Sequence, residues 1–344
     1  MHFYASFLRP LLFQIPHETV HACFSTVLHH FPTLIPPLTW QQPTPLMGLT
    51  FPNPLGLAAG LDKHGLCLPA WHRMGFGSVE IGGVTPHPQP GNPLPRIFRL
   101  PKAQALINRM GFNSVGMHQV AHNIHHKPEG LMVGINMAKN KDTPLTKAYH
   151  DYQAILDTLY PFADYFTLNI SSPNTENLRQ LQQSKHLQAL LMPLKEQLAR
   201  LNQRSGIFKP LAIKIAPDLN EQDIQTLLND CIQCGIDGIV ATNTTLSRQG
   251  VEGLPNAQET GGLSGEPLFT RSTHVLALLK KYKGNHPIDL IGVGGILTPQ
   301  DAKAKFKAGA AAIQIYTGLI YHGPGFIQDI VLGLSGYLTN RGNL

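Results

Sequence analysis

Short apolar segments, each ending in a polar or glycine-rich turn and followed by a stretch of helical spacing, recur through most of this 344-residue chain. Strands that alternate with helices predict a parallel sheet with right-handed crossovers. Eight such segments suit a closed (β/α)8 TIM barrel, an α/β fold, better than an open sheet. The expected strands are 55–59, 78–81, 131–136, 165–169, 211–215, 238–242, 290–293 and 312–315, and helices are expected at 184–201, 221–234 and 298–308.

A barrel needs about 250 residues, so part of the chain requires another explanation. Residues 1–40 carry only Arg9 and Glu18 as formal charges, and their apolar residues recur at helical spacing. We expect two short amphipathic helices separated near Pro16, then a proline-rich linker from 32 to 45. This small helical unit, 1–40, precedes a barrel domain, 41–344. The gap between the second and third strands is about twice the others, and its start, 86–101, predicts an insertion over the barrel mouth.

The composition narrows the class of protein. Hydrophobic residues make up 42% of the chain, which indicates a packed core and excludes a disordered protein. The net charge of +6 permits nucleic acid or anionic lipid as a partner but requires neither. Four cysteines are too few for a disulfide scaffold, and Pro10 and Pro16 interrupt any signal-like apolar start. We therefore expect a reducing cytoplasm, and no segment is apolar for long enough to span a bilayer.

Every expected strand ends in polar or glycine-rich residues, and the carboxyl ends of barrel strands carry the chemistry. Lys214 lies inside an apolar strand, so it either faces a fixed anion or reaches solvent at the strand end. The turn 292–295, Gly-Val-Gly-Gly, offers backbone N–H groups to a phosphate. A loop serine such as Ser172 usually forms a turn or caps a helix, which is the alternative to a chemical role. No histidine or aspartate lies near it in sequence to form a hydrolytic triad. The amides expected to form a binding ring for a planar polar ligand are Asn108, Asn169, Asn174 and Asn243.

Three other patterns suggest metal or thiol chemistry less convincingly. His17-Glu18-x-x-His21 matches the H-E-x-x-H zinc pattern but has no obvious third ligand. Cys231-x-x-Cys234 closes a helix, whereas a reactive thiolate gains from a helix start, so core packing is expected. The histidines in 118–126 follow helical spacing in a hydrophilic stretch and indicate a solvated helix face. We expect no metal site.

The motifs at the strand ends closely resemble those of the dihydroorotate dehydrogenase family, in order and over essentially the whole chain. They are 53–63 (NPLGLAAGLDK), 107–113 (INRMGFN), 134–136 (GIN), 169–174 (NISSPN), 216–218 (APD), 241–245 (ATNTT), 260–265 (TGGLSG) and 292–296 (GVGGI). The serine at 172 and the helical extension resemble class 2, the quinone-dependent, membrane-associated branch of bacterial type. Class 1 members use a cysteine base and lack the extension.

The resemblance implies a role for individual residues of this chain. Ser172 would be the catalytic base. FMN would contact Ala59, Gly60, Leu61, Asp62, Lys63, Gly83, Asn136, Asn169, Lys214, Thr242, Gly265, Gly295, Tyr316 and Thr317. Dihydroorotate or orotate would contact Lys63, Asn108, Arg109, Met110, Gly111, Phe112, Asn169, Asn174, Asn243 and Thr244. Many relatives have Gly-Thr-Val-Thr where this chain has Gly82-Gly83-Val84-Thr85. Gly83 therefore puts in question the side-chain contact to flavin that the threonine of those relatives would make.

The resemblance also implies the reaction and its partners. Dihydroorotate would be oxidised to orotate in pyrimidine synthesis, with FMN as cofactor and a quinone, ubiquinone or menaquinone, as acceptor. The chain would be a monomer that binds no nucleic acid. It would lie on the cytoplasmic side of the inner membrane as a peripheral protein, with the helical unit 1–40 on the bilayer and admitting the quinone. One alternative is an RNA-reducing flavoenzyme similar to dihydrouridine synthases, which would need a catalytic cysteine and a basic C-terminal domain. The other is a non-catalytic membrane-binding module.

Overall fold

The computed structural model describes residues 4–175 and 177–341. Eight parallel strands close into a barrel, so the predicted fold class is confirmed. These strands are the eight that the sequence predicts, with ends that differ by a few residues at most. In chain order they are β3 (Leu55–Leu57), β4 (Ser78–Val84), β7 (Met132–Met137), β8 (Tyr165–Asn169), β9 (Leu211–Ile215), β10 (Gly238–Ala241), β12 (Asp289–Val293) and β13 (Ala312–Ile315).

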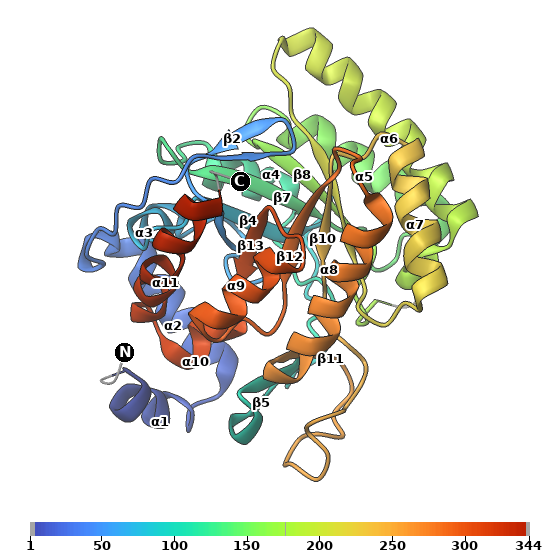
Figure 1. Cartoon of the computed structure of the whole chain (residues 1–344). Helices are drawn as coiled ribbons and strands as arrows, with labels where there is room; N and C mark the ends of the chain where they lie inside the picture. The colour runs from blue at the N-terminus through green and yellow to red at the C-terminus, as the bar shows by residue number, and fades with distance from the viewer. Residues whose placement is uncertain (1–3, 176, 342–344) are drawn as a thin grey trace.

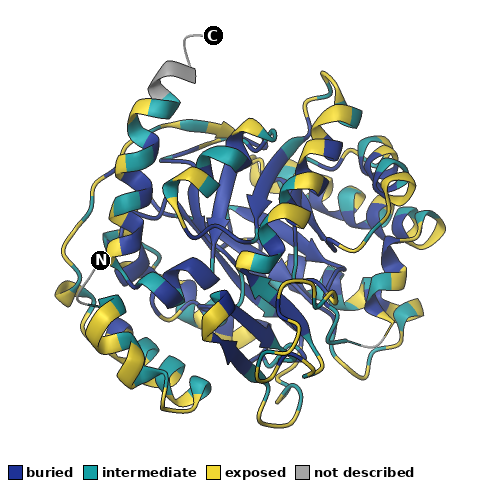
Figure 2. Cartoon of the chain, turned by 60° about the horizontal axis from the view of Figure 1, so that its bottom comes forward, coloured by how far each residue is buried: buried dark blue, intermediate teal, exposed yellow. Residues whose placement is uncertain are grey.

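Helices surround the barrel (Figure 1) and bury its strands on all sides (Figure 2). The expected helices are present, and α7 begins where Asn220 accepts a hydrogen bond from the Asp223 N–H. A capping box between Thr298 and Asp301 starts α9. The helices are α3 (Leu68–Arg73), α4 (Met117–Ile124), α5 (Ala148–Leu159), α6 (Ser184–Ser205), α7 (Glu221–Gln233), α8 (Phe269–Lys283), α9 (Pro299–Lys307), α10 (Thr317–His322) and α11 (Gly325–Arg341).

A hairpin, β1 (Thr44–Leu46) and β2 (Leu49–Phe51), closes the amino-terminal end of the barrel. The predicted linker is therefore wrong at its C-terminal end. Met47 and Gly48 both have positive φ, as in the turns that join short hairpins. The hairpin packs on residues inside the barrel such as Val240 and Ile291. Local sequence hid it because strands of three residues show no clear alternation.

The predicted insertion over the barrel mouth is confirmed as two strands, β5 (Ile97–Leu100) and β6 (Ala105–Asn108). They form an antiparallel sheet with β11 (Gly262–Gly265), which comes from the connection between β10 and β12. Because β11 is far from β6 in sequence, the pairing of these two strands was not predictable. The sheet brings Asn108 and Ser264 to the same end of the barrel.

The helical unit is described from Tyr4 onward as η1 (Tyr4–Leu8), α1 (Arg9–Leu12), α2 (His17–His30) and η2 (Pro32–Leu34). The break before α2 falls at Pro16, as predicted. The unit lies beside α10 and β5 (Figure 1), where Glu18 pairs with Arg96 at 2.8 Å and Arg99 donates to the Ile15 carbonyl at 2.9 Å. Within the described residues, no helix is both long and apolar enough to cross a membrane.

Candidate active site

A pocket of about 1060 Å³, counting its open mouth, lies at the carboxyl ends of the barrel strands and is lined from all eight of them. Nineteen of the sequence-predicted site residues line it: Ala59, Gly60, Lys63, Gly83, Asn108, Met110, Phe112, Asn136, Asn169, Ser172, Asn174, Lys214, Thr242, Asn243, Thr244, Gly265, Gly295, Tyr316 and Thr317.

Four predicted site residues are outside this lining. The Asp62 carboxylate turns toward α3 and accepts hydrogen bonds from the Cys67 N–H at 2.9 Å and the Trp71 indole at 3.0 Å. Leu61 is buried in the core. Arg109 pairs with Glu259 at 2.6 Å. Gly111, with φ +69°, packs against the Asn92 side chain. These residues hold the two loops around the pocket and do not face it.

Lys214 projects from β9 into the pocket and is only 6% exposed, so the alternative of a lysine reaching solvent is wrong. Its Nζ has no hydrogen-bond partner among the described residues. Burial lowers the pKa of this ammonium, and the charge of Glu80 acts in the opposite direction. A buried cation without a hydrogen-bonding partner is costly. The site therefore requires an anionic or electron-rich ligand group beside Lys214.

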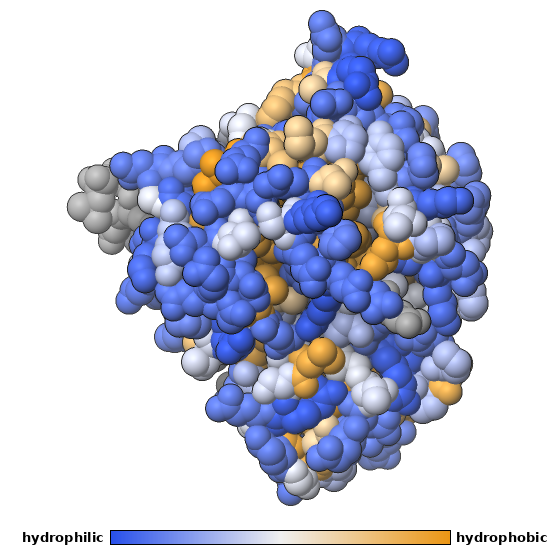
Figure 3. Space-filling model, turned by 90° about the vertical axis from the view of Figure 1, so that its right-hand side faces the viewer, coloured by the Kyte–Doolittle hydropathy of each residue, from blue (hydrophilic) through white to orange (hydrophobic). Residues whose placement is uncertain are grey.

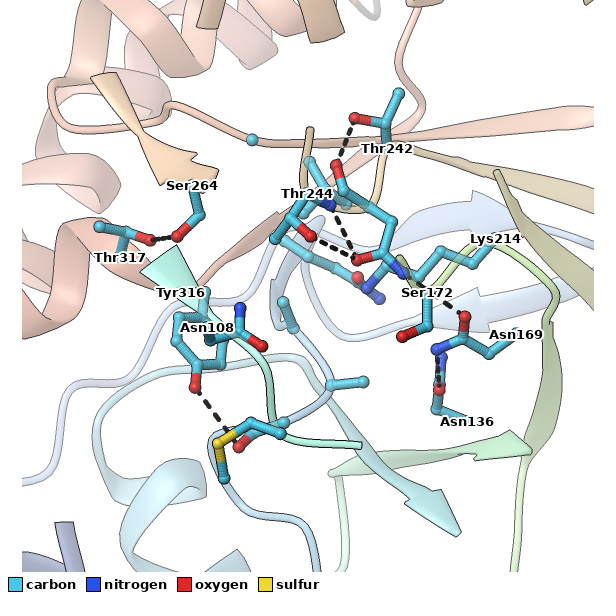
Figure 4. Close-up of a pocket in the computed structure, with 18 of the residues that line it drawn as sticks. Asn108, Asn136, Asn169, Ser172, Lys214, Thr242, Thr244, Ser264, Tyr316 and Thr317 are labelled. Atoms are coloured by element: carbon cyan, nitrogen blue, oxygen red, sulfur yellow. Dashed lines mark hydrogen bonds between the residues drawn. The ribbon is translucent and has the colours of Figure 1, made fainter. Parts of the chain in front are cut away.

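Glu80 was missed at the sequence level, although an acidic residue inside an apolar strand was a usable signal. It is fully buried on β4 and accepts hydrogen bonds from Asn136 at 2.7 Å and Gln314 at 2.8 Å. The amide chain continues from Asn169 to Asn136 at 2.8 Å and from Asn243 to Asn169 at 3.4 Å (Figure 4). The buried carboxylate thus sets the orientation of amides that face the ligand.

Ser172 follows β8 and faces the pocket on the same side as Lys214 and Asn169 (Figure 4). Its Oγ accepts a hydrogen bond from the Asn174 N–H at 3.2 Å, and the Asn174 amide donates to Asn108 at 3.2 Å. The hydroxyl hydrogen has no acceptor among the described residues, so it is free for a ligand. No histidine, cysteine or carboxylate belongs to the described lining, which excludes a hydrolytic triad here.

Lys63 also lines the pocket and donates to Asn113 at 2.7 Å. Burial, reinforced by the charge of Arg96, lowers the pKa of Lys63 to about 7, whereas Glu18 raises it. Asn113 was missed as a site residue even though it ends the motif at 107–113. An anion that binds beside Lys63 favours the protonated form of this amine and so raises its pKa.

The end of the pocket after β12 and β13 is lined by backbone. Gly294 and Gly295 have φ of +106° and +74°, and a Cβ on Gly295 would lie 2.4 Å from Phe269. Only glycine fits this turn, because a Cβ on either residue would strike the start of α8 or the residues just before it. Thr317 donates to Ser264 at 3.0 Å, a lining residue that the sequence did not single out. This is the position at which barrels commonly bind phosphate.

Gly83 contributes only backbone to the pocket. A Cβ at this position would lie 2.7 Å from the Phe112 ring and 2.9 Å from Ala138. The Phe112 ring therefore fills the space that a larger residue at 83 would need. This chain has no side-chain contact to offer a cofactor here.

The competing motifs have structural explanations. Glu18 of the H-E-x-x-H pattern pairs with Arg96, and the ring Nε2 of His21 is 2.7 Å from the Leu61 carbonyl. No cluster of histidine, cysteine and acidic residues able to hold a metal occurs in the described ranges. Cys231 is fully buried, and burial raises the pKa of its thiol, as expected for core packing. The α4 histidines are exposed.

The fold and the pocket together define an enzyme of the (β/α)8 barrel class, with a polar pocket at the carboxyl ends of its strands, where enzymes of this fold carry their chemistry. The dihydroorotate dehydrogenase family model matches residues 43–338. With this match over most of its length, the chain belongs to the dihydroorotate dehydrogenase family.

Individual relatives agree with this assignment. A dihydroorotate dehydrogenase (quinone) from Thiobacillus denitrificans is 48% identical over 330 residues, covering 95% of this chain and 98% of the relative. One from Nitrosomonas eutropha is 48% identical over 338 residues, covering 97% and 98%. The crystal structure of ligand-free DHODH from Eimeria tenella has a TM-score of 0.87 at 37% identity, covering 94% of this chain and 95% of that one.

Proposed function

We propose that this chain oxidises (S)-dihydroorotate to orotate, with FMN as cofactor and a quinone as electron acceptor, in pyrimidine biosynthesis. The observation that carries the proposal is the pocket itself. An unpartnered buried lysine and a free serine hydroxyl face it, together with the amides of Asn108, Asn136, Asn169, Asn174 and Asn243. The names of the relatives add the substrate and the acceptor. The family does not include the RNA-reducing alternative, whose catalytic cysteine has no counterpart in the described lining.

The residues present fit FMN. The unpartnered Lys214 would stabilise the negative charge that the flavin ring gains on reduction. The glycine turn at 294–295 would bind the flavin phosphate. When bound, FMN accepts a hydride and returns the electrons to a quinone. We assign the cofactor contacts to Ala59, Gly60, Asn136, Asn169, Lys214, Thr242, Gly265, Gly295, Tyr316 and Thr317, all in the lining, and to backbone at Gly83.

The substrate is assigned to the part of the pocket between Lys63 and the amides. Orotate carries one carboxylate and alternating ring donors and acceptors, so an ammonium and several amides match it. Ser172 removes the C5 proton of dihydroorotate as C6 loses a hydride, which leaves the C5–C6 double bond of orotate. A serine hydroxyl is a weak base, so Ser172 needs a route for the proton to solvent.

Purified protein tests the function directly. We expect a yellow protein whose visible absorbance bleaches with dihydroorotate and recovers with a soluble quinone. Turnover should be fast with quinone and slow with fumarate or NAD⁺ under the same conditions. A colourless protein that binds no added FMN, or turnover with NAD⁺ alone, would contradict the proposal.

Orotate affinity should fall as pH rises through about 7, because the pKa of Lys63 lies near that value and only its protonated form attracts the carboxylate. Burial lowers the pKa of Lys63, so in the ligand-free protein this amine loses its positive charge as the pH rises through about 7. The attraction for the orotate carboxylate falls with it. Equilibrium titration of the flavin absorbance with orotate, from pH 5.5 to 9, measures this. Lys63→Met should bind orotate weakly with no such pH dependence; an unchanged profile would refute the assignment.

We propose residues 1–40 as the unit that meets the membrane and the quinone, and 41–344 as the catalytic domain. Large apolar side chains of this unit are exposed: Leu8 42%, Leu11 63%, Ile15 43%, Val27 45%, Phe31 58% and Leu34 67%. The side of the molecule that carries α6 and α7, by contrast, is predominantly hydrophilic (Figure 3). Apolar side chains gathered on one unit favour contact with a lipid surface. They support peripheral contact with a membrane, and we propose that the chain is a monomer on the cytoplasmic face of the inner membrane.

The double variant Leu11→Glu/Leu34→Glu should bind anionic vesicles roughly tenfold less in a sedimentation assay, because two exposed apolar side chains become charged. Reduction of the bound flavin by dihydroorotate should stay normal, since neither residue lines the pocket. The control is Ile207→Glu, whose side chain is 58% exposed in the connection between α6 and β9, outside the helical unit. Equal vesicle binding by both variants would contradict the proposed membrane surface.

A further inference from the structure

Behind the glycine turn at 294–295 lies a buried lysine that the function proposed above does not use. Lys305 projects from α9, has no exposed surface, and donates to Ser272 Oγ at 2.6 Å. Its Nζ also lies 5.0 Å from the centre of the Phe269 ring. No ion pair of this lysine is formed with the described residues. A buried ammonium with one hydroxyl partner and one aromatic face lacks a counter-charge.

Ser272 connects this lysine to the turn. Its Oγ lies 3.1 Å from the Gly294 carbonyl and 3.1 Å from the Phe269 carbonyl of its own helix. Because Oγ accepts a hydrogen bond from Lys305, its own hydrogen is available for these carbonyls. The Gly294 carbonyl therefore points away from the pocket, toward α8 and α9.

The peptide between Gly294 and Gly295 is trans, so its N–H points opposite to its carbonyl. With the carbonyl fixed by Ser272, the Gly295 N–H is directed to the pocket side, and this N–H has no partner among the described residues. A hydrogen bond at the carbonyl strengthens the N–H of the same peptide as a donor, and a cation behind it adds to the effect. Lys305, Ser272 and the peptide thus form a short polar relay that ends in the pocket.

We propose that Lys305, acting through Ser272, fixes and polarises the Gly294–Gly295 peptide so that its N–H binds the phosphate of the flavin, and that Lys305 thereby makes the site selective for phosphorylated flavin. This inference rests on the proposed function. Lys305 is a positioning residue, because it is shielded from the pocket by the turn. Burial lowers the pKa of its ammonium to about 7, Asp301 raises it, and a bound dianion favours the protonated form.

The test compares two ligands that differ only in the phosphate. Apoprotein of the full chain is titrated with FMN and with riboflavin, and flavin fluorescence gives both dissociation constants. Lys305→Met keeps an unbranched apolar side chain, shorter by one atom, and removes the charge. We expect FMN to bind roughly tenfold more weakly and riboflavin to bind as in the wild type. Ser272→Ala, which breaks the relay but keeps the lysine, should reduce the preference for FMN in the same way.

Lys307→Met is the matched control, because Lys307 is on the same helix but exposed. Its charge is screened by solvent, so the preference for FMN should be unchanged. An unaltered ratio of the two dissociation constants in Lys305→Met, or an equal loss of both flavins, would overturn the inference. Wild-type apoprotein that binds neither flavin would instead refute the proposed function, so the two failures are distinguishable.

Discussion

Ser172→Ala should retain FMN and bind orotate normally, yet reduce its flavin with dihydroorotate roughly 10²- to 10⁴-fold more slowly, the range that a general base contributes. The hydroxyl hydrogen of Ser172 has no acceptor among the described residues, and its Oγ is positioned only by the Asn174 N–H at 3.2 Å. Alanine therefore removes the proton acceptor, and the one partner that it leaves unsatisfied is the N–H of the half-buried Asn174. Stopped-flow bleaching of the flavin measures the rate.

The neighbouring serine supplies the control for this variant. Ser171 is fully buried, lies outside the lining, and donates to Asn169 at 3.3 Å. Ser171→Ala should slow flavin reduction by no more than about tenfold, since it loses two supporting hydrogen bonds, the one to Asn169 and one accepted from the Asn243 amide at 3.0 Å, but no group that faces the pocket. A near-normal rate in Ser172→Ala would eliminate Ser172 as the base. Equal losses in the two variants would indicate that only the loop geometry matters.

Lys214→Met should lose flavin from the purified protein, and the flavin that remains should be reduced at least about 10²-fold more slowly. The magnitude is that of removing one fixed charge from a buried site in which negative charge develops. Visible absorbance per mole of protein gives the first quantity and stopped-flow the second. The apoprotein should be no less stable than wild type, because a buried cation without a hydrogen-bonding partner has been removed.

Lys209→Met separates this role from a purely structural one. Lys209 is also buried, at 7% exposed, but it precedes β9 at the far end of the barrel and donates to the Tyr160 and Ala163 carbonyls. Its replacement leaves these carbonyls unsatisfied, so the melting temperature should fall while flavin content and reduction rate stay normal. A yellow, fully active Lys214→Met protein would contradict the assigned role.

The barrel was predictable because its signal is local. Parallel strands buried on both faces are continuous apolar runs, such as Leu211–Ile215, and the residues that follow them form turns. The closed barrel of eight parallel strands then places all eight carboxyl ends on the same rim. Lys214 could be singled out for the same reason, because a charged residue within such a run has few explanations.

What the sequence could not determine are the contacts between distant segments. The pairing of β6 with β11 joins residues about 150 positions apart. β6 has a local partner in β5, but no local spacing indicates its pairing with β11. The hairpin at 44–51 is defined by what it packs against inside the barrel. Asp62 and Arg109 lie next to site residues in sequence, yet their side chains turn away because Trp71 and Glu259 bind them.

The sequence by itself therefore determined the barrel, the helical unit before it and most residues of the pocket, since each follows from the period and polarity of a short segment. The tertiary structure alone decided which polar groups have partners. Glu80 orients the amides, Lys214 has no hydrogen-bond partner within the described residues, and Lys305 reaches the glycine turn through Ser272. The physical reason is that the cost of burying a charge depends on neighbours that only the folded chain brings together.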